Sequence, residues 1–265
     1  MKQLFYTGFT VLLFVIVFLC LQLGVNLVCM LVWQNFSTNA LAIIVASSVT
    51  SLLTIAVFAW LRWSPFSRDY LRSAPWATLL WVVVLALGTL IPSMALEEWM
   101  GVDMDDNFKQ FFETFMSRRE GYLAVGILAP IAEEMVFRGA VLRLLLQKME
   151  GKWHWGAIAL SALLFGIVHG NLAQGLHAFL LGLLLGWLYY RTDSIIPGIV
   201  LHWVNNSIAF AVSNIMPQWN DAKLTDIFGT QQNVLLAVGF SLLIFLPALW
   251  QIAILNKKGE THNAP

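Results

Sequence analysis

Residues 130–141 read PIAEEMVFRGAV and lie inside a long apolar segment that covers residues 121–148. Three formal charges, those of Glu133, Glu134 and Arg138, therefore fall within six residues in a stretch whose neighbours favour lipid. A charged side chain at the centre of a bilayer costs about 2.5–3.5 kcal/mol on insertion scales, so such groups face a protein interior or a water-filled cavity. This stretch predicts a polar functional site inside a membrane protein.

The composition of the whole chain agrees with that class. Of the 265 residues, 59% are hydrophobic and 11% are charged, whereas a soluble domain carries about 25% charged residues. Fifteen basic residues are balanced by fifteen acidic ones, so nothing favours a nucleic-acid partner. We therefore expect an all-α polytopic membrane protein with the lipid bilayer as its surroundings.

Apolar segments of the length needed to cross a bilayer, about 20 residues, predict a bundle of about eight transmembrane helices. They cover residues 4–33, 40–61, 76–96, 121–148, 154–170, 172–190, 194–215 and 233–255. Only Gly170-Asn171 separates the fifth from the sixth, which predicts a tight helical hairpin. The first segment is longer than the apolar core of a signal peptide, roughly 7–15 residues, and is interpreted as a retained transmembrane helix.

The chain divides into three parts by this pattern. Residues 1–120 contain three spans and an acidic insertion, residues 121–215 the charged core helices, and residues 216–265 a polar loop and the last span. Apolar side chains at helical spacing in the insertion predict an amphipathic helix on the membrane surface, with a solvated loop as the alternative: Phe108, Phe111, Phe112, Phe115 and Met116. The acidic pair Glu97-Glu98 is expected to be a solvated helix end.

The distribution of lysine and arginine predicts the orientation of the chain in the membrane. With the expected spans, ten of these residues lie on the side of the N-terminus, four lie on the opposite side, and Arg138 lies within a span. Lysine and arginine accumulate on the cytoplasmic side of membrane proteins. We expect both termini to be cytoplasmic, and the general character of the chain is that of a bacterial inner-membrane protein.

Helical spacing predicts different surroundings for the two adjacent glutamates. Glu134 and Arg138 are four residues apart and share a helix face, with the acid first, which is the favoured order for an ion pair. Glu133 is rotated by about 100° from its neighbour, faces another helix and is free for chemistry. Pro130 cannot donate a backbone hydrogen bond, so the helix should be loosened just before the charges.

Two later segments carry polar groups at the same spacing of four residues. Phe165 and His169 share one face, and His202 and Asn206 share another. At about 1.5 Å per residue, Glu133 and His169 each lie roughly 22 Å from the cytoplasmic ends of their segments. His202 and Asn206 lie roughly 12 and 18 Å from the cytoplasmic end of theirs. These depths allow the four polar side chains to meet in one layer. A polar clamp between helices remains the alternative for any one of them.

Three motifs occur in order on successive apolar segments: EExxxR at 133–138, FxxxH at 165–169 and HxxxN at 202–206. Each is weak alone, but together they resemble the CPBP intramembrane proteases, also called the Abi or type II CAAX prenyl endopeptidase family. The resemblance implies a bundle of eight transmembrane helices around a water-filled cavity, and a glutamate-dependent peptidase. The motif itself does not separate the two glutamates; we assign Glu134 and Arg138 to shaping the site.

The same resemblance implies roles for four side chains. Glu133 and His169 would activate a water that attacks a peptide carbonyl. His202 and Asn206 would donate hydrogen bonds to the oxyanion of the tetrahedral intermediate. The substrate would be a peptide or a membrane-associated protein.

The metal requirement is left open by the residues themselves. Proteins of this family are often called metalloproteases, and Glu133, His169 and His202 would make a three-ligand zinc set with an open fourth position. The two-histidine motif HExxH is absent, however, so a metal-independent water mechanism is favoured and a divalent metal such as zinc is the alternative. His177 is expected to be a packed, hydrogen-bonded histidine rather than a cavity residue.

Two other functions remain as alternatives. One is a binding or bacteriocin-immunity protein that uses the same scaffold without turnover. The other, less favoured, is a proton-coupled transporter in which the buried charges form an ion path, although no paired halves with broken helices are visible. The serine motif GxSxG and an aspartyl GxGD motif are both absent.

Overall fold

The structure is a computed structural model that describes residues 2–102, 106–149, 153–220 and 222–256, so part of the acidic insertion and the last residues lie outside it. Its elements follow in the order α1 (Lys2–Val32), η1 (Phe36–Thr38), α2 (Ala40–Trp60), α3 (Arg68–Arg72), α4 (Trp76–Met100), α5 (Asp106–Met116), η2 (Leu123–Leu128), α6 (Ala129–Glu134), η3 (Met135–Leu142), α7 (Arg143–Lys148), α8 (His154–Ile167), α9 (Leu172–Thr192), α10 (Ile196–Ile215), η5 (Pro217–Trp219), α11 (Leu224–Phe228) and α12 (Gln231–Leu255). Every regular element within the described ranges is helical.

Six of the described helices are long and apolar enough to cross a membrane. They are Tyr6–Val32, Ala40–Trp60, Trp76–Met100, Leu172–Thr192, Ile196–Ile215 and Gln231–Leu255. The chain is therefore an all-α polytopic membrane protein, as predicted. The predicted number of eight spans is not confirmed, although the two other predicted segments are also helical.

The predicted span at residues 121–148 differs most from a regular helix. Two π-helical stretches, Leu123–Leu128 and Met135–Leu142, flank the short α-helix Ala129–Glu134 that carries the two glutamates. Pro130, which lacks a backbone N–H, stands at the start of that α-helix. Isolated π-helical turns often occur at functional sites, so the irregular backbone coincides with the charged stretch that the sequence singled out.

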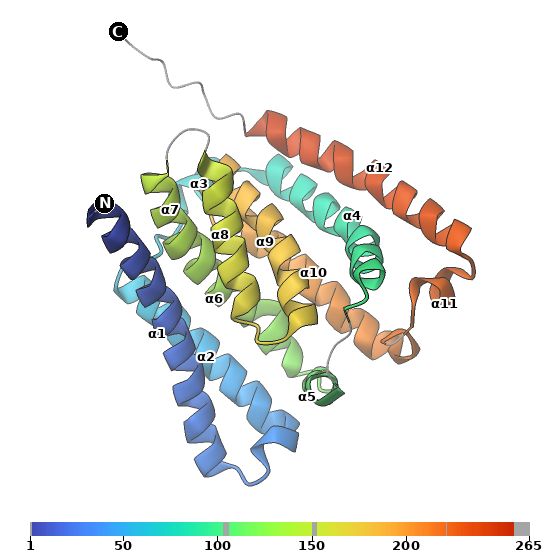
Figure 1. Ribbon diagram of the computed structural model, residues 1–265, viewed down its shortest axis with the longest axis horizontal. Coiled ribbons are helices and arrows are strands. Elements are labelled where there is room, and N and C mark those ends of the chain that lie inside the picture. The colour runs from blue at the N-terminus through green and yellow to red at the C-terminus, as the bar shows by residue number, and fades with distance from the viewer. Residues whose placement is uncertain (1, 103–105, 150–152, 221, 257–265) are drawn as a thin grey trace.

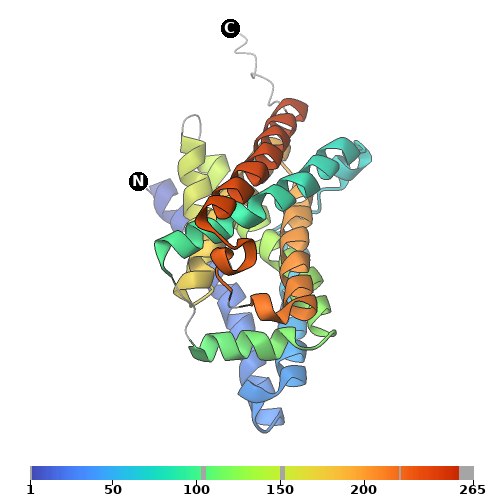
Figure 2. The same ribbon diagram turned by 90° about the vertical axis from the view of Figure 1, so that its right-hand side faces the viewer.

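The helices pack in pairs around this irregular segment. α1 packs against α2, α8 against α9, and α4 against α12. The central helices α6 to α10 lie between the α1–α2 hairpin on one side and the α4–α12 pair on the other (Figure 1). In the second view α5 runs across the end of the central helices (Figure 2). The charged segment is thus covered by helices from both halves of the chain.

The predicted hairpin between α8 and α9 is confirmed. Gly170 has a positive φ of 68°, and the Asn171 side chain caps α9 by accepting a hydrogen bond from the Gln174 backbone N–H at 3.2 Å. A Cβ added to Gly166 would lie 2.6 Å from the carbonyl oxygen of Gly175. Small residues let membrane helices approach closely, and here they bring α8 against α9 and fix the position of the histidine at the hairpin.

The predicted amphipathic helix is present as α5. Its Phe115 and Met116 side chains are buried, in a small cluster with residues of α2 and η2: Ile43, Ile44 and Ala124. The side chains of Phe108 and Phe111 lie outside the part of the chain that the structure describes. The end of α5 thus packs on protein, which places its aromatic side chains beside the central helices.

Candidate active site

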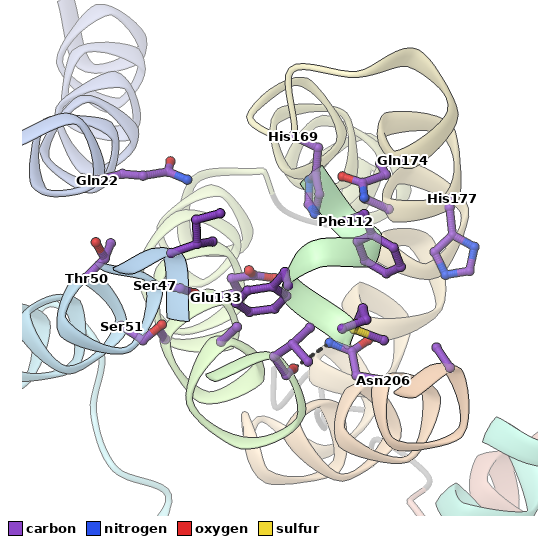
Figure 3. Close-up of a pocket in the computed structure, with 18 of the residues that line it drawn as sticks. Gln22, Ser47, Thr50, Ser51, Phe112, Glu133, His169, Gln174, His177 and Asn206 are labelled. Atoms are coloured by element: carbon purple, nitrogen blue, oxygen red, sulfur yellow. Dashed lines mark hydrogen bonds between the residues drawn. The ribbon is translucent and has the colours of Figure 1, made fainter. Parts of the chain in front are cut away.

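A cavity of about 670 Å³ lies between the α1–α2 hairpin and the central helices. Glu133, His169, His202 and Asn206 all contribute to its lining, although they come from three different parts of the chain. Figure 3 labels Glu133, His169 and Asn206. The structure therefore brings together the four side chains to which the sequence assigned catalytic roles, and those roles remain predictions.

The charged pair on the fourth segment is fully buried beside this cavity. Arg138 Nη1 donates to Glu134 Oε1 at 2.7 Å, and the two side chains are 1% and 0% exposed. Arg138 Nη2 also donates to the Gly182 carbonyl at 3.3 Å, and the guanidinium lies 4.5 Å from the centre of the Phe165 ring. Buried charges are tolerated when they are paired and hydrogen-bonded. The arginine thus compensates Glu134 and joins the fourth segment to α8 and α9.

Glu133 has a different environment from its neighbour. Its side chain is 21% exposed and faces the cavity, with Oε2 3.8 Å from His202 Nε2. The other ring nitrogen of His202, Nδ1, lies 3.5 Å from Glu134 Oε1. Whichever ring nitrogen carries the proton, a carboxylate lies on that side. His202 is therefore held between the two glutamates, and only Glu133 is open to the cavity.

The hydrogen bond of His169 determines which of its nitrogens is available. Its Nδ1 lies 2.7 Å from the Phe165 carbonyl oxygen, which can only accept, so Nδ1 carries the proton. In the neutral ring Nε2 then has a free lone pair, and Figure 3 shows the ring directed into the cavity. The Phe165 ring contacts both imidazoles edge-on, at centroid distances of 5.0 Å for His169 and 5.9 Å for His202. One phenyl ring thus sets the spacing of the two histidines.

Asn206 is oriented by two neighbours. Its Nδ2 donates to the Val125 carbonyl oxygen at 2.9 Å, the dashed line in Figure 3. Its Oδ1 accepts a longer hydrogen bond from Asn205 Nδ2 at 3.4 Å. An amide nitrogen has two N–H groups, so one remains for a group in the cavity. Val125 belongs to the first π-helical stretch, which links the irregular backbone directly to the orientation of this side chain.

The prediction for Glu97 as a solvated helix end is wrong. Glu97 Oε1 lies 2.6 Å from His177 Nδ1, and both side chains line the cavity. Its neighbour Glu98 is exposed, as expected, and accepts a hydrogen bond from the Leu224 backbone N–H at 2.9 Å. His177 is hydrogen-bonded, as predicted, but it also faces the cavity. Glu97 and His177 are 80 residues apart, so no local spacing could have joined them.

The opposite wall of the cavity has no charged side chain and combines apolar with polar ones. It carries amide and hydroxyl side chains from α1 and α2: Gln22, Asn26, Ser47, Thr50 and Ser51. Figure 3 shows the α2 members and Gln22 on one side of the cavity and His169 and His177 on the other. Such groups donate and accept hydrogen bonds without a net charge. No sequence pattern marks this wall, because single serines and threonines are common in apolar helices.

The zinc set considered from the sequence does not fit the arrangement. Within the described residues, no group of three or more histidine, cysteine, aspartate or glutamate side chains is placed to hold a metal ion. We therefore derive no step through a metal.

The helices and the cavity define an integral membrane protein with a polar site buried among its helices. Residues 120–208 match the model of the family described as type II CAAX prenyl endopeptidase Rce1-like. That range contains all three motifs, so the family resemblance is confirmed for this part of the chain, and it supports a protease of the membrane. Comparisons with the curated proteins and with the solved structures gave no match.

Proposed function

We propose that the chain is an intramembrane endopeptidase that hydrolyses a peptide or a membrane-associated protein with an activated water. The observation that carries the proposal is the meeting of Glu133, His169, His202 and Asn206 at one cavity. The match of the surrounding segment to a peptidase family supports the same reaction.

Glu133 and His169 are suited to activate the water. The Glu133 carboxylate is the only one of the adjacent pair that reaches the cavity, and in neutral His169 the lone pair of Nε2 is free. A water between them gives up one proton to the Glu133 carboxylate as its oxygen forms a bond to the peptide carbonyl carbon. The same proton passes to the amide nitrogen when the carbon–nitrogen bond breaks. Proton transfer by a positioned group typically contributes about 10²–10⁴ in rate.

Asn206 and His202 are suited to stabilise the oxyanion. One N–H of Asn206 is held by the Val125 carbonyl, which leaves the second N–H for the developing negative charge. His202 borders the same space from one turn earlier on α10. Removing one oxyanion donor typically costs about 10²–10³ in rate.

The polar wall of α1 and α2 is suited to the substrate backbone. Peptide N–H and C=O groups need hydrogen-bond partners when they leave water, and the amides and hydroxyls of this wall supply both kinds. A cavity of about 670 Å³ lies within the range of roughly 300–1,000 Å³ of small-molecule sites. It admits a short segment of peptide, which favours an extended stretch of a membrane-associated chain.

The test is a comparison of the peptides in membranes from cells that express the native chain or Glu133→Gln. The matched control is Glu113→Gln, which removes an exposed carboxylate that does not line the cavity. We expect a cleavage product with the native chain and the control, and none with Glu133→Gln. Identical peptides from all three would refute the proposal. A cellular effect that persists in Glu133→Gln without any product would instead indicate the binding or immunity role.

A further inference from the structure

A hydrogen-bonded chain outside the three motifs leads from α4 to the proposed oxyanion donor. Glu97 Oε1 lies 2.6 Å from His177 Nδ1, and His177 Nε2 lies 3.4 Å from Asn205 Nδ2. Asn205 Nδ2 lies 3.4 Å from Asn206 Oδ1. Three helices, α4, α9 and α10, each contribute to the chain. No part of the mechanism above uses its first three members.

The direction of each hydrogen bond follows from the groups involved. Asn205 Nδ2 can only donate, so His177 Nε2 and Asn206 Oδ1 both accept. The proton of neutral His177 then lies on Nδ1, where the Glu97 carboxylate accepts it. All three hydrogen bonds are satisfied only by this tautomer of His177. If the proton moved to Nε2, Asn205 would lose its acceptor and would no longer be held toward Asn206.

The surroundings keep this chain out of bulk water on one side. His177 and Asn205 line both the polar cavity and a second cavity of about 720 Å³ between α4, α9 and α12. The second cavity is lined mostly by leucine, tryptophan and phenylalanine. Hydrogen bonds are stronger in low-dielectric surroundings, and successive ones polarise each other. A donor to Asn206 Oδ1 therefore also strengthens the N–H groups of the same amide.

We propose that Glu97, His177 and Asn205 are positioning residues that orient and polarise the Asn206 amide toward the oxyanion. This inference rests on the proposed function. The chain itself touches no reacting atom, and it acts only through Asn206. Its loss should therefore reduce the rate of the chemical step and leave substrate binding largely unchanged.

The kinetic test is a double-mutant cycle on a peptide that spans the cleavage site found in membranes. We expect His177→Phe and Asn205→Leu each to lower kcat by about 10-fold with KM changed less than about twofold, since the loss of one hydrogen bond of about 1.4 kcal/mol corresponds to a tenfold change in rate. In an Asn206→Ala background the same changes should have almost no further effect, because they act through the missing amide. The control Glu98→Gln, one residue along α4, should retain the native kcat. Additive losses in the cycle would overturn the inference and leave the proposed function intact.

A spectroscopic test does not depend on turnover. In the full chain labelled with ¹⁵N-histidine, the His177 signals are assigned by their loss in His177→Phe. We expect Nδ1 to be protonated and Nε2 to be unprotonated, and the Nε2 signal to shift in Asn205→Leu. A protonated Nε2 on neutral His177 would overturn the inference whatever the activity. Cleavage that does not depend on Glu133 would refute the proposed function instead.

Discussion

Replacement of Arg138 by methionine removes the positive member of the buried pair and keeps an unbranched side chain. The arginine is 1% exposed, donates to Glu134 Oε1 at 2.7 Å and to the Gly182 carbonyl at 3.3 Å, and stacks on Phe165 at 4.5 Å. Methionine leaves the Glu134 carboxylate at 0% exposure without its partner. Removing one partner of a buried ion pair costs about 3–5 kcal/mol.

A loss of that size corresponds to roughly 10²- to 10⁴-fold in the ratio of folded to unfolded protein. The assay is reversible unfolding in detergent micelles by added SDS, followed by tryptophan fluorescence and circular dichroism. The matched control is Arg72→Met, which breaks the ion pair between Arg72 and Asp69. The Arg72 side chain is 79% exposed and the Asp69 side chain 98%. Exposed pairs contribute about 0–1 kcal/mol, so the control should stay close to the native chain.

The double variant Glu134→Gln with Arg138→Met separates charge from packing. Because the uncompensated carboxylate is then absent, we expect the double variant to be more stable than Arg138→Met alone by at least about 2 kcal/mol. A loss of stability in Arg138→Met no larger than that in the Arg72 control would show that Glu134 does not need this partner. A loss in the double variant equal to the sum of the two single losses would show that the two side chains are not coupled.

Three further predictions concern other parts of the molecule. Gly198→Ala places a Cβ 2.5 Å from Glu134 Oε2 and should destabilise the protein by about 1–3 kcal/mol in the same unfolding assay. Its counterpart Gly239→Ala has open space around the added Cβ and should stabilise α12 by up to about 1 kcal/mol. Burial raises the pKa of Tyr70, between α2 and α4, from its usual 10.0 to about 12. The unfolded chain therefore loses this proton first, and the free energy of unfolding falls as the pH rises from about 10 to about 12. The free energy of unfolding of Tyr70→Phe should fall less over the same range in a pH series of unfolding curves. A C-terminal fusion to green fluorescent protein should fluoresce and one to alkaline phosphatase should be inactive, as the cytoplasmic orientation predicts; the reverse result would contradict that topology.

The parts of the site that the sequence predicted depend on neighbours along one helix. Glu134 and Arg138 are one turn apart, so their ion pair follows from spacing alone, and the different exposure of Glu133 follows from the rotation per residue. Hydropathy likewise located the helices, because each span must satisfy its own backbone hydrogen bonds in lipid.

Contacts between distant helices could not be predicted in the same way. Glu97 meets His177 across 80 residues, and Asn205 joins them only because α9 and α10 pack side by side. The π-helical stretches also escaped prediction beyond the loosening expected at Pro130, since nothing in the spacing of apolar residues distinguishes them from α-helix. These features depend on how the helices cross, which a hydropathy pattern does not contain.

The two π-helical stretches make the length of the fourth segment as important as its composition. A π-turn closes its backbone hydrogen bond one residue later than an α-turn, so each stretch absorbs an extra residue without breaking the helix. If Met135–Leu142 closed as ordinary α-helix without losing a residue, everything that follows would turn by about 100°. Arg143–Lys148 would then present another face to α8, while both glutamates kept their places. Deleting one residue from this stretch would instead restore the α-helix with Arg143–Lys148 still facing α8, so this part of the segment should tolerate a one-residue deletion that would misalign a regular helix.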